Sequence, residues 1–421
     1  MKVVLPYGHE KISLEIPDKN VVGILEPRDI PGVSDPLKEI KNALENPLDA
    51  PRISEIVEKG DKIAIVVDDH TRPAPSYLMV PPILDELEKA GIPMSDVFII
   101  FACGTHRPVK PEEMKKLLGE ETLKRVPKEN IVSHNCDAPD LVYCGKTSRG
   151  TPVYVNRLYY EADVKILTGD ITLHYYAGYG GGPKSILPGI SGRITIQHNH
   201  AMLLDPNAKM GVAKGNPIHE DMMEAAKKAG VDFVLNVVMN TKKEIVKAYA
   251  GKLETVFYTG IKLIDQIYKV PIECKPDIIV ASPGGHPFDI NFYQATKGLY
   301  TADLAVKDGG AIILLAACPE GIGHKVFHEW MLKYKNSKEV GDALRREFIL
   351  GGHKALYLYS TVERVKVYLK TEMDPELVKN VLKCTPIEDP QQTLNELLKE
   401  NSDALVCIMP FANETLPVIK K

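Results

Sequence analysis

A short apolar run followed by a polar loop and a helix occurs twice in succession near the start of the chain. The run KIAIVV at residues 62–67 is almost without polar side chains, which suits a strand buried on both faces of a parallel sheet. A helix is expected from Tyr77 to Ala90, followed by Gly91. The pattern recurs with a strand from Val97 to Phe101 and a helix from about residue 111 to 118. Two such units in succession are typical of an α/β fold with a parallel sheet.

A second α/β region begins after a proline-containing stretch at residues 271–276. The apolar strand DIIVAS at residues 277–282 leads into the loop PGGHP, a helix through Gln294 and Lys297, and a buried strand at residues 311–316. We therefore predict an α/β protein of two α/β domains with largely parallel sheets. The N-terminal domain is expected to span residues 1–270 and the C-terminal domain residues 275–421, each long enough to bury its own core.

Composition excludes several classes of protein. A formal net charge of −4 argues against a general nucleic-acid or anionic-membrane binder. No run approaches ~18 apolar residues, and the N-terminus has neither the apolar core nor the cleavage site of a signal peptide. The seven cysteines are scattered without a C-x-x-C pair. We expect a cytoplasmic protein with no membrane or nucleic-acid partner, in which most cysteines are small buried hydrophobes.

Polar loops follow three of the predicted strands. They are DDHTRPAPS at residues 68–76, ACGTHRP at residues 102–108, and the segment that begins at Thr168 after the strand at residues 164–167. Ligands of open parallel sheets bind outside the carboxyl ends of the strands. The sequence therefore predicts that these three loops face one crevice.

The third of these loops is rich in glycine. Six glycines lie between Gly178 and Gly192, and Lys184 stands among them between Pro183 and Pro188. Glycine lets backbone N–H groups approach an anion that a Cβ atom would exclude. The segment GYGGGPKS comes close to a phosphate-binding Walker A motif, but Pro183 replaces a required glycine and has no N–H to donate. A phosphate-loop nucleotide-binding enzyme therefore stays as an alternative of a different class.

Histidines and charged residues accompany these loops. His106 and His174 follow predicted strands, and imidazole is the usual proton carrier near neutral pH. His198 and His200 are two residues apart on a predicted helix, so at most one should face the crevice, and no zinc-ligand spacing is present. The charged residues after the first strand either pair with one another, or Asp69 holds ribose hydroxyls and Arg72 a carboxylate.

Together these motifs resemble the nickel-dependent lactate racemase family, although none would suffice alone. The resemblance extends over both predicted domains. The segments that carry it are DDHTRP at residues 68–73, CGTHR at 103–107, HYYAGYGGGPK at 174–184, HNH at 198–200 and YQATK at 293–297.

The resemblance implies a two-domain α/β enzyme whose active site lies in the interdomain cleft. It also implies a nickel-pincer nucleotide, a pyridinium-3,5-bisthiocarboxylic acid mononucleotide whose two sulfur-bearing arms clamp nickel together with a ring carbon. Carried onto this chain, Lys184 would attach the cofactor through a thioamide, and His200 would be the protein ligand to nickel. His106 and His174 would form the acid–base pair. The remaining implied roles are substrate binding by Arg72, Tyr293, Gln294 and Lys297, and contacts to the ribose and phosphate by Asp69, Thr71, Gly180, Gly181 and Gly182.

The implied activity is racemisation of a 2-hydroxy acid, lactate by default, through reversible hydride transfer and a 2-keto acid intermediate. The chemistry agrees with the residues, because a planar keto acid accepts hydride on either face and the hydroxyl proton then needs a base on each side. Family members acting on a larger or more polar 2-hydroxy acid remain an alternative, as does a non-catalytic nucleotide- or metal-binding protein. The implied partners are the small-molecule substrate and, transiently, proteins that mature the cofactor.

Overall fold

The computed structural model describes residues 1–420 and divides into two compact units. We call Asp29–Ile267 the central unit. The terminal unit combines Met1–Arg28 with the chain from Tyr268 onward. Within the described part of the chain, no helix is long and apolar enough to cross a membrane.

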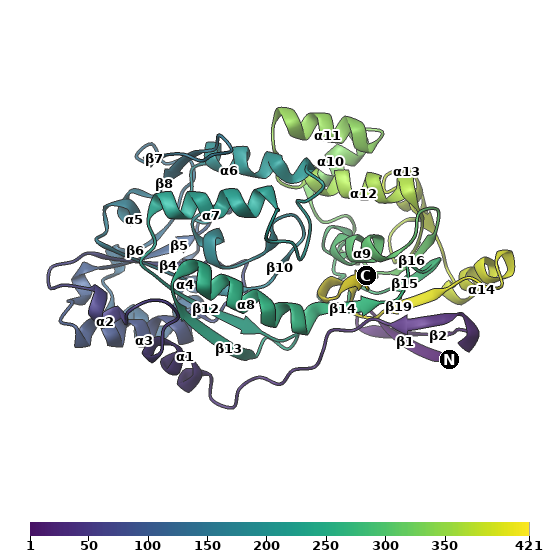
Figure 1. The fold of residues 1–421 in the computed structure, drawn as a ribbon. Helices are drawn as coiled ribbons and strands as arrows, with labels where there is room; N and C mark the ends of the chain where they lie inside the picture. Colours follow the sequence, from purple (N-terminus) through teal and green to yellow (C-terminus); the bar gives the residue numbers. More distant parts are fainter. Residues whose placement is uncertain (421) are drawn as a thin grey trace. The chain divides into compact units, whose positions relative to one another are not determined.

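A six-stranded sheet forms the middle of the central unit (Figure 1). Five neighbouring strands run parallel, and an antiparallel edge strand completes the sheet. Their spatial order is β13 (Ile245–Gly251), β12 (Phe233–Met239), β9 (Val164–Ile171), β4 (Ile63–Asp68), β5 (Val97–Ala102) and β6 (Ile131–Ser133).

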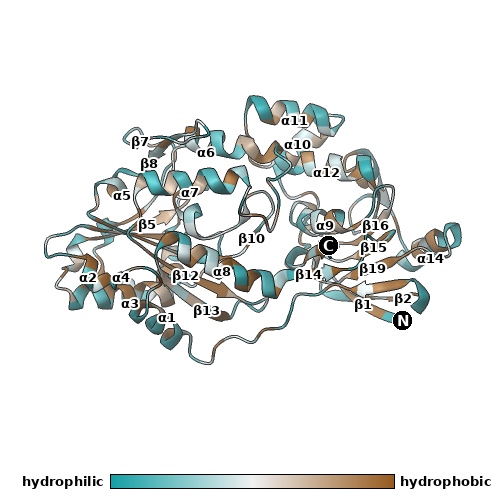
Figure 2. Ribbon diagram, viewed as in Figure 1, coloured by the Kyte–Doolittle hydropathy of each residue, from teal (hydrophilic) through white to brown (hydrophobic). Residues whose placement is uncertain are grey.

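Both faces of this sheet are buried, as the apolar run at residues 62–67 predicts. Ile63 and Val67 of β4 belong to a core that also contains Ile83 and Leu87 of α3, whereas Val66 points to the opposite face and is also fully buried. The strands are accordingly brown in Figure 2, while the outer faces of the helices are mostly teal. The helices are α1 (Pro36–Glu45), α2 (Ile53–Ile56), α3 (Ser76–Lys89), α4 (Pro111–Arg125), α5 (Arg157–Glu161), α6 (Arg193–His200), α7 (Pro217–Ala229) and α8 (Leu253–Tyr268).

Two small hairpins and two short 3₁₀ helices complete the part of the central unit that matters for the site. The hairpin of β10 (Leu173–His174) and β11 (Gly178–Tyr179) follows β9 directly. The glycine-rich loop then forms η4 (Gly182–Ser185), and η5 (Ala201–Leu204) continues from α6. The other hairpin consists of β7 (Val142–Lys146) and β8 (Pro152–Val155).

The terminal unit contains a second six-stranded sheet, in which every pair of neighbours is parallel. Its order is β18 (Thr385–Pro386), β17 (Lys366–Lys370), β16 (Ala311–Leu315), β15 (Ile278–Ala281), β19 (Val406–Met409) and β3 (Val21–Ile24). Two further strand pairs are β1 (Lys2–Tyr7) with β2 (Glu10–Glu15), and β14 (Lys269–Ile272) with β20 (Leu416–Ile419). The helices are α9 (Phe292–Ala305), α10 (Lys325–Lys333), α11 (Ser337–Arg346), α12 (Gly352–Arg364), α13 (Pro375–Asn380) and α14 (Pro390–Glu400).

The predicted α/β class with largely parallel sheets is confirmed, but the start of the first domain is wrong. The first 28 residues belong to the terminal unit, because β3 pairs with β19 and Leu5 of β1 packs in one core with Val280 of β15. Figure 1 shows the purple β1–β2 hairpin beside these strands. Pairing between segments almost 400 residues apart, such as Val21 with Val406, leaves no local signal in the sequence.

Candidate active site

The three loops predicted to share one crevice do lie at one edge of the central sheet. Strands β9, β4 and β5 are adjacent and parallel, so their carboxyl ends at Ile171, Asp68 and Ala102 meet at the same edge. The segments that follow these strands carry the predicted site residues of the central unit up to Lys184, and His200 lies at the end of α6. Tyr293, Gln294 and Lys297 lie in the terminal unit on α9, which follows β15 of its own parallel sheet.

His106 is held by a carboxylate. Its Nδ1 atom lies 2.7 Å from Oδ2 of Asp69, whose other oxygen accepts hydrogen bonds from the backbone N–H (2.9 Å) and the hydroxyl (2.6 Å) of Thr71. Burial would raise the pKa of Asp69, but the hydrogen bonds from His106 and Thr71 outweigh it and lower the pKa. An ionised carboxylate only accepts, so the proton of neutral His106 lies on Nδ1 and its Nε2 carries the lone pair.

This geometry gives Asp69 and Thr71 a role that was not predicted from the sequence. Asp69 is only 1% exposed, and both of its oxygens are already occupied by His106 and Thr71. The hydroxyl of Thr71 is likewise used as a donor to Asp69. These two residues are therefore suited to orienting His106, and their contact with ribose stays a prediction.

The glycine-rich loop is packed against its own protein. The N–H of Gly180 donates to the carbonyl of Thr172 at 2.8 Å, and the N–H of Gly182 donates to Oδ1 of Asn236 at 2.9 Å. A Cβ atom at Gly178 would lie 1.9 Å from the carbonyl oxygen of Val212. The expectation that the N–H groups of Gly180 and Gly182 bind phosphate is thus not met, because close packing already uses both glycines.

Asn236 is a structural residue that sequence reasoning did not identify. It is fully buried on β12, and besides accepting from Gly182 it donates to the carbonyl oxygens of Gly169 at 3.2 Å and Leu235 at 3.0 Å. It therefore ties the start of η4 to the central sheet. A polar residue within the apolar strand FVLNVVM was the signal that could have identified it.

Lys184 lies on η4 among other charged groups. Burial lowers the pKa of its amine well below the usual range, the positive charge of Arg72 adds to the effect, and Asp68 opposes it. The residue as a whole remains partly exposed. A neutral lysine amine is nucleophilic, whereas an ammonium group is not.

Asp68 and Asp170 form a second acidic feature beside Lys184. Burial and the neighbouring charge of Asp170 raise the pKa of Asp68 to about 8. Burial raises the pKa of Asp170 too, and its Oδ2 has no hydrogen-bond partner among the described residues. The pair holds a proton near neutral pH, which distinguishes Asp68 from the ionised Asp69 next to it.

Tyr176 connects the remaining predicted residues of the central unit. Its ring centroid lies 4.4 Å from that of His174 and 5.2 Å from that of His200, and Nζ of Lys184 is 5.9 Å from the same centroid. His200 is 4% exposed, and burial together with the charge of Lys184 lowers its pKa to about 3. Tyr176 lies in one of the motifs that carry the family resemblance, but no role was predicted for it.

His174 is held differently from His106. Its Nδ1 accepts a hydrogen bond from the backbone N–H of Ala177 at 3.3 Å, and its ring stacks on Tyr175 with a centroid separation of 4.8 Å. An accepting Nδ1 places the proton of the neutral ring on Nε2. In their neutral forms, the two predicted acid–base histidines are therefore tautomers of opposite kind.

In the terminal unit, the predicted substrate residues lie in the first two turns of α9. The side chain of Asn291 caps this helix by accepting from the N–H of Gln294 at 3.0 Å. The buried Lys354 of α12 donates to the carbonyl of Tyr293 and lies 3.9 Å from its ring centroid. Burial and the charge of Lys297 lower the pKa of Lys354 well below its usual range. Lys354 was missed because nothing in its sequence context distinguishes it from a surface lysine.

The side chains of the central unit fit the implied cofactor in two respects and differ in a third. Lys184 offers an amine whose ammonium form is disfavoured by burial, and His200 a neutral imidazole of the kind that binds nickel. The glycine loop, in contrast, offers no N–H from Gly180 or Gly182. Among residues 1–420, no group of three or more His, Cys, Asp or Glu side chains is arranged to hold a metal ion.

Comparison with known proteins decides the family. The family model "Lactate racemase N-terminal domain" matches residues 7–211, and "Lactate racemase C-terminal domain" matches residues 272–410. A lactate racemase of Thermoanaerobacterium thermosaccharolyticum is 35% identical over 97% of both chains, and one of Lactiplantibacillus plantarum is 32% identical over 90% of both. The chain belongs to the lactate racemase family.

Solved structures of similar proteins agree with the membership in the lactate racemase family. The lactate racemase apoprotein from Thermoanaerobacterium thermosaccharolyticum superimposes with a TM-score of 0.90 at 33% identity, covering 100% of both chains. A protein from Thermotoga maritima, 19% identical, covers 91% of this chain and 97% of its own with a TM-score of 0.63, which shows the fold alone. The family resemblance of the sequence motifs and the α/β class are thus confirmed, and this lactate racemase family member is an isomerase.

Proposed function

We propose that this protein interconverts the two enantiomers of lactate with a nickel-pincer nucleotide attached to Lys184. The observation that carries the proposal is the pair of histidines His106 and His174. They follow β5 and β9, which end at the same sheet edge with β4 between them, and their neutral rings are held as opposite tautomers. Racemisation needs a proton acceptor on one side of the substrate and a proton donor on the other. Two imidazoles of unlike tautomer supply that pair.

Lys184 and His200 are the residues that hold the cofactor in this proposal. Lys184 would be the attachment point, because burial and the neighbouring Arg72 disfavour the ammonium form of its amine. The neutral imidazole of His200 provides one ligand to nickel. When bound, the cofactor accepts the hydride from C2 of the substrate and returns it to either face.

The proton is handled by the two histidines. Nε2 of His106 accepts the hydroxyl proton of one enantiomer, while Asp69 stabilises the imidazolium that forms. His174 delivers a proton to the carbonyl oxygen of the keto acid from the other side. The reverse reaction exchanges the two roles, so each histidine acts once as base and once as acid.

In this proposal, Arg72 and Lys297 bind the substrate carboxylate. Both side chains are exposed, and guanidinium and ammonium groups are the usual partners of a carboxylate. Gln294 and Tyr293 are partly exposed on the same helix as Lys297, where an amide and a ring suit the hydroxyl and the methyl group of lactate. Arg72 belongs to the central unit, and Tyr293, Gln294 and Lys297 belong to the terminal unit. Proteins that mature the cofactor are the expected transient partners.

The test is to express the protein with the cofactor pathway and to follow C2-deuterated lactate in ordinary water. We expect an intact-mass adduct on Lys184, bound nickel, and racemised product that retains deuterium at C2. A keto acid that takes hydride back from the cofactor keeps the label, whereas proton abstraction at C2 would wash it out. Racemisation with loss of the label, or turnover without an adduct, would overturn the proposal. A parallel chiral assay with larger and more polar 2-hydroxy acids identifies the preferred substrate.

A further inference from the structure

We propose that Asn199 and Asp221 are positioning residues that fix His200 in the tautomer whose Nε2 carries the lone pair. The inference deepens the proposed function and rests on the role given there to His200 as a metal ligand. Neither Asn199 nor Asp221 belongs to the residues that the family resemblance assigns. Both are fully buried, and they adjoin His200 through a continuous series of hydrogen bonds.

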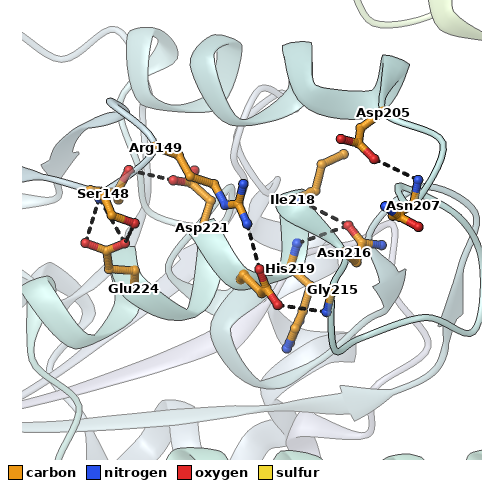
Figure 3. A network of polar contacts seen from close by, with 12 residues as sticks. Ser148, Arg149, Asp205, Asn207, Gly215, Asn216, Ile218, His219, Asp221 and Glu224 are labelled. Carbon is orange, nitrogen blue, oxygen red and sulfur yellow. Dashed lines mark hydrogen bonds and ion pairs between the residues drawn. The ribbon is translucent and has the colours of Figure 1, made fainter.

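The series begins at His200 on α6 and ends on the β7–β8 hairpin. Oδ1 of Asn199 lies 3.0 Å from Nδ1 of His200, and Nδ2 of Asn199 lies 2.9 Å from Oδ2 of Asp221 on α7. Asp221 in turn accepts from the hydroxyls of Thr147 at 2.6 Å and Thr151 at 2.9 Å. Figure 3 shows Asp221 on its helix beside Ser148 and Arg149 of the hairpin.

The surroundings of Asn199 determine which way its amide group points. One end of the amide faces two acceptors, the carboxylate of Asp221 and the carbonyl oxygen of Ile218 at 3.1 Å. Only an NH₂ group satisfies two acceptors, so the amide nitrogen must occupy this end. The end that faces His200 is therefore the oxygen.

The orientation of the amide then decides the position of the histidine proton. An amide oxygen has no hydrogen to donate, so the hydrogen bond exists only if Nδ1 of His200 carries the proton. In a neutral imidazole the lone pair is then on Nε2, and the ring is directed by its bond to Asn199. Hydrogen bonding at the second nitrogen is how proteins orient metal-binding histidines.

Asp221 gives this arrangement its rigidity. Its two carboxylate oxygens take three donors from two segments, Thr147 and Thr151 of the β7–β8 hairpin and Asn199 of α6. If Asp221 only joined α7 to the hairpin, its hydrogen bonds with Thr147 and Thr151 would be sufficient. The contact with Asn199 extends that link to His200, which a purely architectural role does not require.

The first test uses the protein without cofactor and reads the tautomer directly. Long-range ¹H–¹⁵N correlation spectra of ¹⁵N-histidine-labelled protein distinguish the two neutral tautomers, and His200→Gln assigns the signal. We expect the Nδ1–H form in the wild type and a shift toward the Nε2–H form in Asn199→Leu. Asp221→Asn, which has one carbonyl oxygen for three donors, should produce a partial shift. Thr195→Val is the matched control, since Thr195 is equally buried on α6 but bonds to the backbone of β8.

The second test measures nickel retained by the adduct-bearing protein during a chelator challenge. Loss of an outer hydrogen bond to a metal-binding histidine typically costs about 10–100-fold in metal affinity. We expect this order for Asn199→Leu, less for Asp221→Asn and none for Thr195→Val, each normalised to the adduct mass. Unchanged tautomer and nickel retention in both Asn199→Leu and Asp221→Asn would overturn the inference and leave the proposed function intact. A wild type that never binds nickel would instead reject the proposed function, while the tautomer measurement would still decide whether Asn199 orients His200.

Discussion

The loop that carries His106 and the hairpin that carries His174 use opposite means to hold the same kind of side chain. His106 bonds through Nδ1 to the buried, ionised Asp69, whereas Nδ1 of His174 accepts from a backbone N–H and the ring rests on Tyr175. The first environment favours the Nδ1–H tautomer of the neutral ring, and the second favours the Nε2–H tautomer. Two proton carriers of one racemase therefore need not be equivalent at rest, even though each must serve in both roles.

Removing either imidazole should have the largest effect on the rate of racemisation. We expect His106→Ala and His174→Ala each to lower the steady-state rate of racemisation at least ~100-fold in both directions, the lower end for general acid–base catalysis. Lactate of each configuration, followed by chiral chromatography, provides the measurement. Near-normal turnover of either variant would remove that histidine from the mechanism.

A smaller but more selective change reverses the tautomer of His106. In Asp69→Asn, Thr71 would still donate to the amide oxygen, so the NH₂ group would face Nδ1 of His106 and force it to accept. We expect a loss in kcat of about 10-fold or more, below the effect of removing the imidazole, since the whole acid–base contribution is about 10²–10⁴-fold. Asp18→Asn is a control at an exposed carboxylate of the terminal unit. An unaltered pH–rate profile in Asp69→Asn would show that the carboxylate does not act on His106.

The raised pKa of Asp68 predicts that its contribution to the free energy of unfolding changes with pH in the opposite direction from that of Asp69. The pKa of Asp68 is raised to about 8 in the folded protein, so its protonated form is favoured by folding. Its contribution to the free energy of unfolding is present below the unfolded pKa of about 4 and is lost as the pH rises toward about 8. Asp68→Asn should therefore gain stability relative to the wild type as the pH rises from about 5 to about 9, measured by urea unfolding. A difference that stays constant over this range would contradict the assignment.

The smallest expected effect concerns the ring that supports His174. Tyr175→Ala removes the stacked partner of the imidazole, and aromatic pairs are worth about 0.5–1.5 kcal/mol, a factor of about 2–12. We expect a loss of kcat in that range, and Tyr175→Phe should retain the rate because it keeps the stacked ring. Equal losses in both variants would assign the effect to the hydroxyl group instead of the stacking.

Local patterns in the sequence predicted the elements of the central sheet closely, because the spacing of apolar residues determines which faces are buried. The strand at residues 62–67 and the helix from Tyr77 to Ala90 were predicted in this way, and they correspond to β4 and α3. The site motifs were identified by resemblance and not by periodicity. What could not be predicted depends on contacts between distant segments, such as β3 with β19, Asn236 with Gly182, and Asp221 with Asn199.

The glycine-rich loop illustrates the same limit. Its composition predicted free N–H groups for an anion, and this inference treats the loop as if it were alone. In the folded protein, Gly178 lies against Val212, and Gly182 donates to Asn236, so the glycines permit close packing. A glycine in a loop therefore has two physical uses, and the packing partner that distinguishes them lies elsewhere in the chain.

The central claim, that His106 and His174 serve opposite sides of one substrate, is tested most directly by single-turnover half-reactions. Loaded His106→Ala and His174→Ala are each mixed with one enantiomer of lactate, and the 2-keto acid formed is measured after a chemical quench. The account predicts a mirror-image result, in which each variant still oxidises one enantiomer rapidly and the two variants differ in which one. Equal loss of both half-reactions in both variants would contradict it.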